Sequence, residues 1–429
     1  MQIIRYPDIR RAPELLIRPA GDLAAFREQV APLLAQVKTG GDAAVQFYAR
    51  QFDGLYPDPV EASPEEFAAA DALLPDALKS AIRQAYSNLH VFHTVQKEPL
   101  QPVETQPGVF CWRKSVPIDK VGLYVPGGTA PLFSTVLMLG VPAQIAACRE
   151  IVLCTPPRRD GSVHPAVLFA ARLCGIRRVF KIGGAQAIAA MAYGTETVPA
   201  VWKIFGPGNS WVTASKQLVG LDGVAVDLPA GPSELAVIAD AAANPAFIAA
   251  DLLSQAEHGT DSQVVLFTPE EGLIKAVQQE LERQLAVLPR RTFAEGALSA
   301  SRAVLVNHLD EAMDWANAYA PEHLILHVQN PEHWAEKVSN AGSVFLGGLT
   351  PESAGDYASG TNHTLPTGGW ARAAAGVSLD SFVKKITFQK IDPQGLQDLG
   401  PVITEMARAE GLEAHARAVD IRLQNIKLS

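Results

Sequence analysis

The chain has 429 residues, of which 48% are hydrophobic and 19% are charged. This length predicts two or more domains, and the composition excludes a chain that is disordered as a whole. The formal net charge of −9, without a concentrated basic stretch, argues against a nucleic-acid-binding protein.

The N-terminus has no apolar segment of signal-peptide length, and no apolar run approaches the roughly 20 residues of a membrane helix. The four cysteines lack CxxC spacing and are expected to be reduced, mostly buried thiols. A catalytic cysteine is an alternative, since dehydrogenases that form acids often use one, but none lies in a turn-rich motif. We therefore expect a cytoplasmic protein with structural cysteines.

The first hundred residues have the apolar spacing of helices. The pattern predicts a helix from Asp22 through Val30 and a second over residues 64–74. Ser63 is the expected N-cap of the second helix, with proline at its first position. A third helix is predicted from Pro75 to about Val95.

Short β-branched runs then alternate with helical stretches, which predicts parallel sheets with helices on their faces. The predicted strands cover residues 151–154, 179–182, 223–227, 235–239, 264–267, 303–306 and 325–328. Helices are predicted over residues 165–173, from 184 onward and over about 272–288.

This alternation predicts two Rossmann-like α/β domains with parallel-sheet cores. One covers residues 124–235. The other is expected to be discontinuous, with residues 21–123 joining residues 236–377. Residues 1–20 form a small N-terminal segment, and residues 378–429 a helical C-terminal tail that breaks near Gly411.

Two glycine-rich turns follow predicted strands of the first α/β domain. Gly183-Gly184 lies where a strand leads into a helix, and the run from Phe205 to Asn209 is a second turn of this kind. Neither is a GxGxxG fingerprint, and such turns also occur where backbone packs closely. Together they favour a dinucleotide-binding domain.

The run from Leu252 to Gly259 ends a predicted helix. Gln255 and His258 are three residues apart, so they lie on one helical face and are suited to ligate one metal ion through an amide oxygen and an imidazole nitrogen. From these eight residues alone, an exposed polar helix end is the favoured interpretation. The polar segments further along the chain favour the metal site instead.

Two further stretches of the chain are rich in polar and titratable residues. Ala320-Pro321-Glu322-His323-Leu324 leads into a predicted strand, and residues 352–367 form a long segment with few apolar residues. Solvated loops have the composition of the latter segment too.

Taken in order, these motifs closely resemble the histidinol dehydrogenase family over nearly the whole chain. The matching segments are residues 122–128, 183–186, 205–209, 252–259, 321–324 and 353–363. One departure is Gly368, where some family members have a bulky aromatic residue, which affects the expected loop shape and not the chemistry.

The resemblance implies a Zn²⁺ ion ligated by Gln255, His258, Asp356 and His415. This set is coherent, because imidazole, amide and carboxylate ligands leave the ion able to bind the imidazole and amine of histidinol. The same four residues would thus also contact substrate. Alone, Asp356 would be interpreted as a turn residue and His415 as a surface histidine.

The resemblance also implies that Glu322 and His323 are the acid–base pair. His323 would take the hydroxyl proton of the alcohol and contact the substrate, and Glu322 would activate water for attack on the aldehyde. Neighbouring strand residues point to opposite faces, so both can act on one substrate only if Pro321 lies in a bent segment. The alternative is a capping pair at the start of a strand.

By the same resemblance, NAD would contact Tyr124, Gln186 and Asn209, and substrate would contact Ser233 and Glu410. His363 is a weaker candidate for substrate contact. A homodimer is implied in which the C-terminal tail reaches the partner's site. Glu410 and His415 are about 140° apart on an ideal helix, so they converge only if the helix breaks between them.

The predicted function is therefore zinc-dependent, NAD-linked oxidation of L-histidinol to L-histidine through the aldehyde, in the last steps of histidine biosynthesis. Three alternatives stay open: a related dehydrogenase for another small polar alcohol, a zinc hydrolase using Glu322 to activate water, and a non-catalytic metal-binding protein.

Overall fold

The computed structural model describes residues 1–19, 23–127, 131–227 and 231–428. Asp22, the expected first residue of the first helix, and Gly128, the last residue of the family-matching segment 122–128, lie outside these ranges. The chain forms two compact units. The first comprises Met1–Gln96 and Ile118–Phe382, and the second comprises Lys97–Pro117 and Val383–Ser429.

The first unit contains a six-stranded parallel sheet. Its order is β1 (Gln2–Arg5), β11 (Arg302–Leu305), β10 (Gln263–Thr268), β9 (Glu234–Ala239), β12 (His323–His327) and β13 (Ser343–Leu346). The sequences of β9 and β10 are almost continuously apolar because both strands are buried on both faces.

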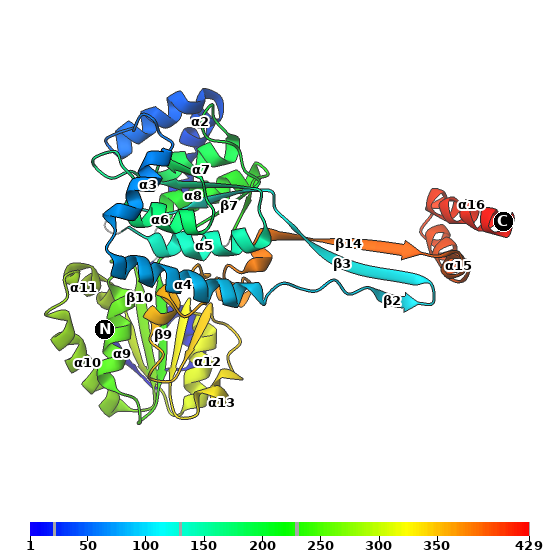
Figure 1. Cartoon of the computed structure of the whole chain (residues 1–429). Helices are drawn as coiled ribbons and strands as arrows, with labels where there is room; N and C mark the ends of the chain where they lie inside the picture. The colour runs from blue at the N-terminus through cyan, green and yellow to red at the C-terminus, as the bar shows by residue number, and fades with distance from the viewer. Residues whose placement is uncertain (20–22, 128–130, 228–230, 429) are drawn as a thin grey trace. The chain divides into compact units, whose positions relative to one another are not determined.

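Helices cover both faces of this sheet (Figure 1). One face packs against α9 (Pro245–Ala256), α10 (Glu271–Leu285) and α11 (Arg291–Ser299). The other packs against α1 (Ala12–Leu15), α12 (Leu309–Tyr319) and α13 (Pro331–Ala335). Short 3-10 turns occupy Ile9–Arg11, Trp370–Arg372 and Leu379–Phe382.

The first unit also contains a five-stranded parallel sheet. Its order is β6 (Arg178–Lys181), β5 (Glu150–Thr155), β4 (Lys120–Tyr124), β7 (Lys203–Phe205) and β8 (Ala225–Val226). One face packs against α3 (Pro64–Leu73), α4 (Asp76–Thr94), α5 (Phe133–Ala146) and α6 (Pro165–Leu173). The other packs against α2 (Leu23–Phe52), α7 (Gly184–Tyr193) and α8 (Ser210–Leu221). The two parallel sheets confirm the predicted fold class.

The N-terminal helices pack differently from the expectation. Residues 21–123 are predicted to join residues 236–377, but in the structure α2, α3 and α4 bury their apolar faces against the five-stranded sheet and its helices. The first helix is also longer than expected, and it continues to Phe52 across a kink at Gly41. Helical periodicity shows that a face is apolar but not which sheet it covers.

The capping prediction for α3 is confirmed. The Ser63 side chain accepts a hydrogen bond from the Glu66 backbone, and the Glu66 carboxylate accepts one from the Ser63 backbone. Across the described residues, no helix is both long and apolar enough to cross a bilayer.

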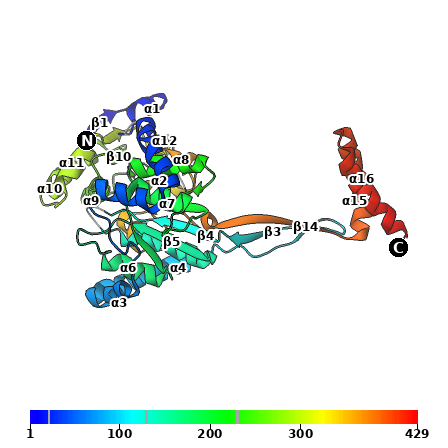
Figure 2. The same ribbon diagram turned by 90° about the horizontal axis from the view of Figure 1, so that it is seen from above.

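The second unit is a three-stranded antiparallel sheet with two helices. Its strands are β2 (Val103–Gln106), β3 (Val109–Pro117) and β14 (Val383–Ile391), and Figure 2 shows β3 and β14 side by side. The chain continues into α15 (Pro393–Ala409) and α16 (Glu413–Leu428). The helical prediction for the tail is wrong for residues 383–391, because pairing with the distant β3 forms a strand there. The break at Gly411 is confirmed by its φ of +75°.

Candidate active site and metal centre

The predicted site residues form two groups, one at the amino end of a strand in the six-stranded sheet and one at the carboxyl ends of strands in the five-stranded sheet. The predicted acid–base residues lie at the amino end of β12 in the six-stranded sheet, beside the first residue of β9. The predicted NAD contacts follow the carboxyl ends of strands in the five-stranded sheet. The strand order of this sheet reverses at β4. Ligands of such sheets usually bind beside the carboxyl ends of the strands at this point.

Glu322 and His323 are held by one backbone segment. The Glu234 N–H donates to Glu322 Oε2 at 2.9 Å, and His323 Nδ1 lies 3.2 Å from the Glu234 carbonyl oxygen. His323 Nδ1 is also 3.7 Å from Glu322 Oε2. Ala320, just before the pair, has a left-handed backbone with a φ of +52°, so the chain is bent as both side chains require.

Burial and charge set the protonation of this pair. Burial disfavours the carboxylate and raises the pKa of Glu322 to about 8. Burial alone would lower the pKa of His323, but the surrounding carboxyl groups of Glu322, Asp356 and Glu352 outweigh it and raise that pKa to about 10. A divalent cation held by Asp356 would repel the imidazolium proton and lower the pKa of His323, so that more of the ring would be neutral, and able to accept a proton, near neutral pH.

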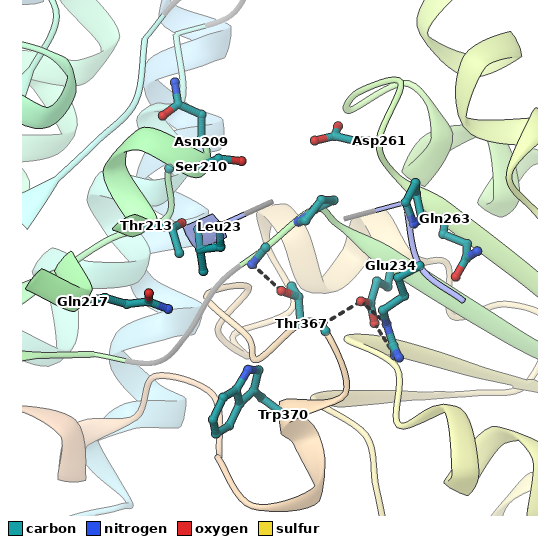
Figure 3. Close-up of a pocket in the computed structure, with 16 residues that line it drawn as sticks. Leu23, Asn209, Ser210, Thr213, Gln217, Glu234, Asp261, Gln263, Thr367 and Trp370 are labelled. Atoms are coloured by element: carbon teal, nitrogen blue, oxygen red, sulfur yellow. Dashed lines mark hydrogen bonds and ion pairs between the residues drawn. The ribbon is translucent and has the colours of Figure 1, made fainter. Parts of the chain in front are cut away.

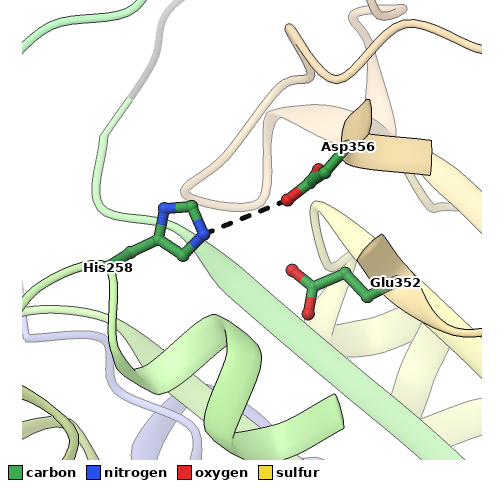
Figure 4. A group of neighbouring side chains, drawn as sticks. All are labelled: His258, Glu352 and Asp356. Carbon is green, nitrogen blue, oxygen red and sulfur yellow. Dashed lines mark ion pairs between the residues drawn. The ribbon is translucent and has the colours of Figure 1, made fainter. Parts of the chain in front are cut away.

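A candidate metal cluster adjoins His323. The ligand atoms of His258, Glu352 and Asp356 all lie within 4.8 Å of one another. Figure 4 shows His258 reaching from the segment after α9 toward Glu352 and Asp356 on α14 (Glu352–Tyr357), a short helix at the start of the polar segment 352–367. Asp356 Oδ2 is 3.9 Å from His258 Nε2, and Asp356 Oδ1 is 3.5 Å from His323 Nε2.

Unsatisfied buried atoms give this region the character of a cation site. Gln255 is 1% exposed, and neither its side-chain oxygen nor its nitrogen has a hydrogen-bond partner. Glu352 Oε1 is also buried without a hydrogen-bond partner, 3.8 Å from His323 Nδ1, while its Oε2 accepts from the Ser254 hydroxyl at 2.6 Å. Such orphaned acceptors are costly unless a ligand satisfies them. The nitrogen and oxygen donors present fit Zn²⁺.

His363 contacts the backbone of Asp356. Its Nδ1 is 2.9 Å from the Asp356 carbonyl oxygen, and its Nε2 is 3.2 Å from the hydroxyl of Thr135, at the start of α5. Burial lowers the pKa of His363, which favours the neutral ring. The weaker sequence candidate therefore lies in contact with a predicted zinc ligand.

A cavity of about 270 Å³ lies beside Glu234, between residues of the two α/β halves. Figure 3 shows Asn209, Ser210 and Thr213 facing Glu234, Asp261 and Gln263 across it. Ser233, a predicted substrate contact, is half-buried and immediately precedes Glu234. Thr367 closes one side, where its hydroxyl oxygen accepts from the Gly231 N–H.

The three predicted NAD contacts line a second cavity of about 640 Å³. Tyr124 ends β4, Gln186 lies in the first turn of α7, and Asn209 caps α8 by accepting from the Val212 N–H at 3.1 Å. The remaining lining residues include Phe52, Asp53, Trp211 and the arginines at 158 and 159. Gln186 is 1% exposed and donates to the Asp53 carboxylate at 3.1 Å.

The second glycine turn has a strict steric requirement. Gly206 has a φ of +126°, and a Cβ there would lie 2.0 Å from the Tyr124 carbonyl oxygen. A buried ion pair beneath the turn connects Lys216 and Asp227, while Asp227 Oδ2 accepts from the Gly206 N–H at 2.7 Å. The backbone of this turn is therefore held on both sides.

Replacing Gly206 with alanine is expected to lower the free energy of unfolding by about 3 kcal/mol or more, through backbone strain and overlap. Urea unfolding followed by circular dichroism measures the change. Gly220→Ala is the matched control, since Gly220 lies in α8 with open space around its Cα. That control is expected to be neutral or stabilising by up to about 1 kcal/mol. Equal effects of both changes would contradict the steric account.

The other predicted site residues, Glu410 and His415, belong to the second unit. Glu410 caps the end of α15 and His415 lies in the first turn of α16, and both are exposed. Gly411 separates the two helices, so Glu410 and His415 do not lie on one continuous helix. Such a break is the condition for the expected convergence of their side chains.

Sequence reasoning missed Glu352 and Glu234. The sequence patterns assign no role to Glu352, which lies in the polar segment 352–367, or to Glu234, which follows Ser233. The available signal for Glu352 was its spacing of four from Asp356, which places both carboxyl groups on one face of a helix. Nothing local in the sequence marks Glu234, whose contacts are all long-range.

Comparisons with known proteins bear on the whole chain. The family model described as histidinol dehydrogenase matches residues 16–423. Histidinol dehydrogenase of Bacteroides thetaiotaomicron is 58% identical over 427 residues, covering 100% of each chain. The same enzyme of Xanthomonas axonopodis pv. citri is 56% identical over 412 residues, 96% of each chain. A crystal structure of histidinol dehydrogenase from Elizabethkingia anophelis has a TM-score of 0.96 at 51% identity, covering 100% of this chain and 99% of that one.

Proposed function

This chain belongs to the histidinol dehydrogenase family, and on that premise we propose that it oxidises L-histidinol to L-histidine through L-histidinaldehyde. It is an oxidoreductase by family. The observation that carries the specific proposal is the buried Glu322–His323 pair beside the His258–Glu352–Asp356 cluster.

His323 is the proposed base of the first oxidation. As the alcohol carbon loses hydride to NAD, its hydroxyl proton passes to the imidazole. Asp356 faces Nε2 of His323, and the Glu234 carbonyl faces Nδ1, so the ring is held from both sides. Orientation by two neighbours keeps the ring aligned with the reacting hydroxyl.

Glu322 is the proposed base for the water that adds to the aldehyde. Its Oε2 is fixed by the Glu234 N–H, which leaves Oε1 for water. The raised pKa of Glu322 makes its carboxylate a stronger base than an exposed glutamate. As water adds, His323 would return its proton to the aldehyde oxygen, so the ring is neutral again, and Glu322 would release the water proton to solvent. The hydrated aldehyde would then lose a second hydride to a second NAD, and His323 would take the hydroxyl proton of that step.

Gln255, His258 and Asp356, with His415 from a C-terminal tail, are the residues that would hold Zn²⁺. A bound zinc ion would orient the imidazole and amine of histidinol and stabilise negative charge on its oxygen. Gln255 supports this assignment through its unsatisfied buried amide. Ser233, Glu410, His323 and His363 are proposed to complete the substrate site.

The cavity lined by Tyr124, Gln186 and Asn209 is the proposed NAD site. Its place at the strand-order reversal of a parallel sheet, with the Gly183-Gly184 turn opening α7, supports a dinucleotide there. We propose a cytoplasmic location for this biosynthetic enzyme.

Turnover with histidinol, NAD and zinc tests the proposal. Two NADH are expected per histidinol consumed, and chelation should abolish the activity until zinc is restored. Turnover of another small polar alcohol in place of histidinol would support the related-dehydrogenase alternative. NAD-independent hydrolysis would support a zinc hydrolase, which leaves the cavity at the five-stranded sheet without a role.

We further propose a homodimer in which the second unit of each chain completes the partner's site. The apolar side chains exposed on this unit within one chain support the proposal, since a large uncovered apolar surface is typical of an interface. They include Ile386, Phe388 and Ile391 on β14, Val402 and Met406 on α15, and Ile421 on α16.

Mixing two inactive variants tests the exchange of tails. His258→Ala and His415→Ala should each be inactive, but a heterodimer with exchanged tails contains one site with both histidines. Unfolding and refolding an equal mixture should therefore restore about a quarter of wild-type activity. The separately refolded variants are the controls. No recovery in the mixture, with dimers present by light scattering, would show that each tail serves its own chain.

A further inference from the structure

Arg18, near the end of the N-terminal segment, forms a bidentate ion pair with Glu234. Its Nε lies 2.5 Å from Glu234 Oε1 and its Nη2 lies 2.9 Å from Oε2. The side chains are only 20% and 3% exposed, and the guanidinium lies 4.1 Å from the centroid of the Tyr319 ring. Two parallel charge-assisted hydrogen bonds and a stacked ring fix the orientation of both partners.

Glu234 connects this ion pair to the acid–base residues. Its N–H holds Glu322 Oε2, and its carbonyl oxygen faces His323 Nδ1. Its carboxylate also accepts from the Gly368 N–H at 2.7 Å, which ties the Thr367–Gly368 loop to the same point. A change in the Glu234 conformation would therefore displace both Glu322 and His323.

Arg18 reaches the same pair by a second route. Its Nη2 donates to the Tyr319 carbonyl at 2.6 Å and lies 3.4 Å from the Ala320 carbonyl. Ala320 is the left-handed residue at which the chain bends before Pro321 and Glu322. The Arg18 guanidinium thus contacts both the backbone just before Glu322 and the carboxylate of Glu234, whose backbone binds Glu322 and His323.

We propose that Arg18 is a positioning residue of the active site, holding Glu322 and His323 in their reactive arrangement through Glu234 and the bend at Ala320. The inference rests on the proposed function of this pair. It makes the N-terminal segment, which carries no predicted site residue, part of the catalytic machinery.

Removing Arg18 should disturb Glu322 and His323 because it leaves the charge of the Glu234 carboxylate uncompensated. Without the guanidinium, the Glu234 carboxylate stays buried with no cation, and it must rotate or admit water. Either response changes the backbone that binds Glu322 and His323. A misplacement of about 1 Å at reacting groups can reduce the rate by about 10²-fold without loss of binding.

Arg18→Met is therefore expected to lower kcat by about 10²-fold, while KM for histidinol and NAD and the zinc content stay within about twofold of wild type. Arg18→Lys, which keeps the charge but not the fork, should recover part of the loss. Arg5→Met is the matched control, since Arg5 lies in the same segment in an exposed pair with Glu271. It should match wild type.

A double variant keeps the inference testable if Arg18→Met does not fold. Arg18→Met combined with Glu234→Gln removes both charges, and its kcat is expected to fall as far as that of Arg18→Met. A kcat within twofold of wild type for either folded variant would overturn the inference. If the wild-type chain does not oxidise histidinol, the proposed function fails, and crystal structures of the Arg18 variants then decide. Glu322 and His323 at their wild-type positions would overturn the inference, whereas loss of the Glu322–Glu234 hydrogen bond would support it.

Discussion

Replacing Glu322 with glutamine is expected to lower kcat for the full oxidation of histidinol by about 10³-fold, because an amide cannot accept the proton of the attacking water. The first hydride transfer should persist, since His323 takes the hydroxyl proton in that step. A rapid-mixing experiment with excess NAD should therefore show one fast NADH per site and a strongly slowed second one. Stability should not fall, because the change removes a buried carboxyl group and keeps its shape.

Glu332→Gln is the control for this experiment. Glu332 is an exposed glutamate in α13, in the same unit, and its replacement should leave both NADH phases unchanged. Equal slowing of both phases by Glu322→Gln would contradict the assignment of Glu322 to water activation. No effect on any measured property would instead favour a non-catalytic metal-binding protein.

Replacing Asp356 with asparagine is expected to reduce zinc affinity by well over about 10²-fold and to abolish turnover at ordinary zinc concentrations. Asparagine keeps the shape but removes the single carboxylate of the predicted ligand set. Competition with a fluorescent zinc chelator measures the affinity directly and does not depend on activity. Excess zinc should restore part of the turnover.

Glu352→Gln separates a direct ligand from a supporting residue. Glu352 is buried beside the cluster, and its Oε2 is already taken by the Ser254 hydroxyl. If Glu352 supports the ligands without binding zinc, its replacement should reduce zinc affinity by about 10- to 100-fold, less than Asp356→Asn. A larger loss than that of Asp356→Asn would place Glu352 among the direct ligands in place of Asp356.

Local sequence patterns determined much of the fold. Alternating β-branched runs and helical stretches predicted both parallel sheets, because each pattern reflects burial of neighbouring residues. Ser63 and Gly411 predicted a helix start and a helix break, because capping and a left-handed backbone depend on residue type at one position. The resemblance to a family then brought together residues that lie far apart in the chain.

Strand 383–391 shows where local patterns were insufficient. It is exposed along most of its length, so no burial pattern distinguishes it from the helical tail that follows. Its Ile386, Phe388 and Ile391 are typical of a strand, but its partner β3 lies more than 250 residues earlier. Pairing over such a separation is decided by tertiary structure.

The sequence by itself determined which residue types are available for the chemistry: the histidines, carboxyl groups and glycine turns. Only the tertiary structure decided that Glu352 adjoins His258 and Asp356, and that Glu234 and Arg18 hold Glu322 and His323. The reason is that these contacts depend on the register of parallel strands and on helix ends packed across a sheet. That arrangement is set by the whole core, and no short stretch of the chain records it.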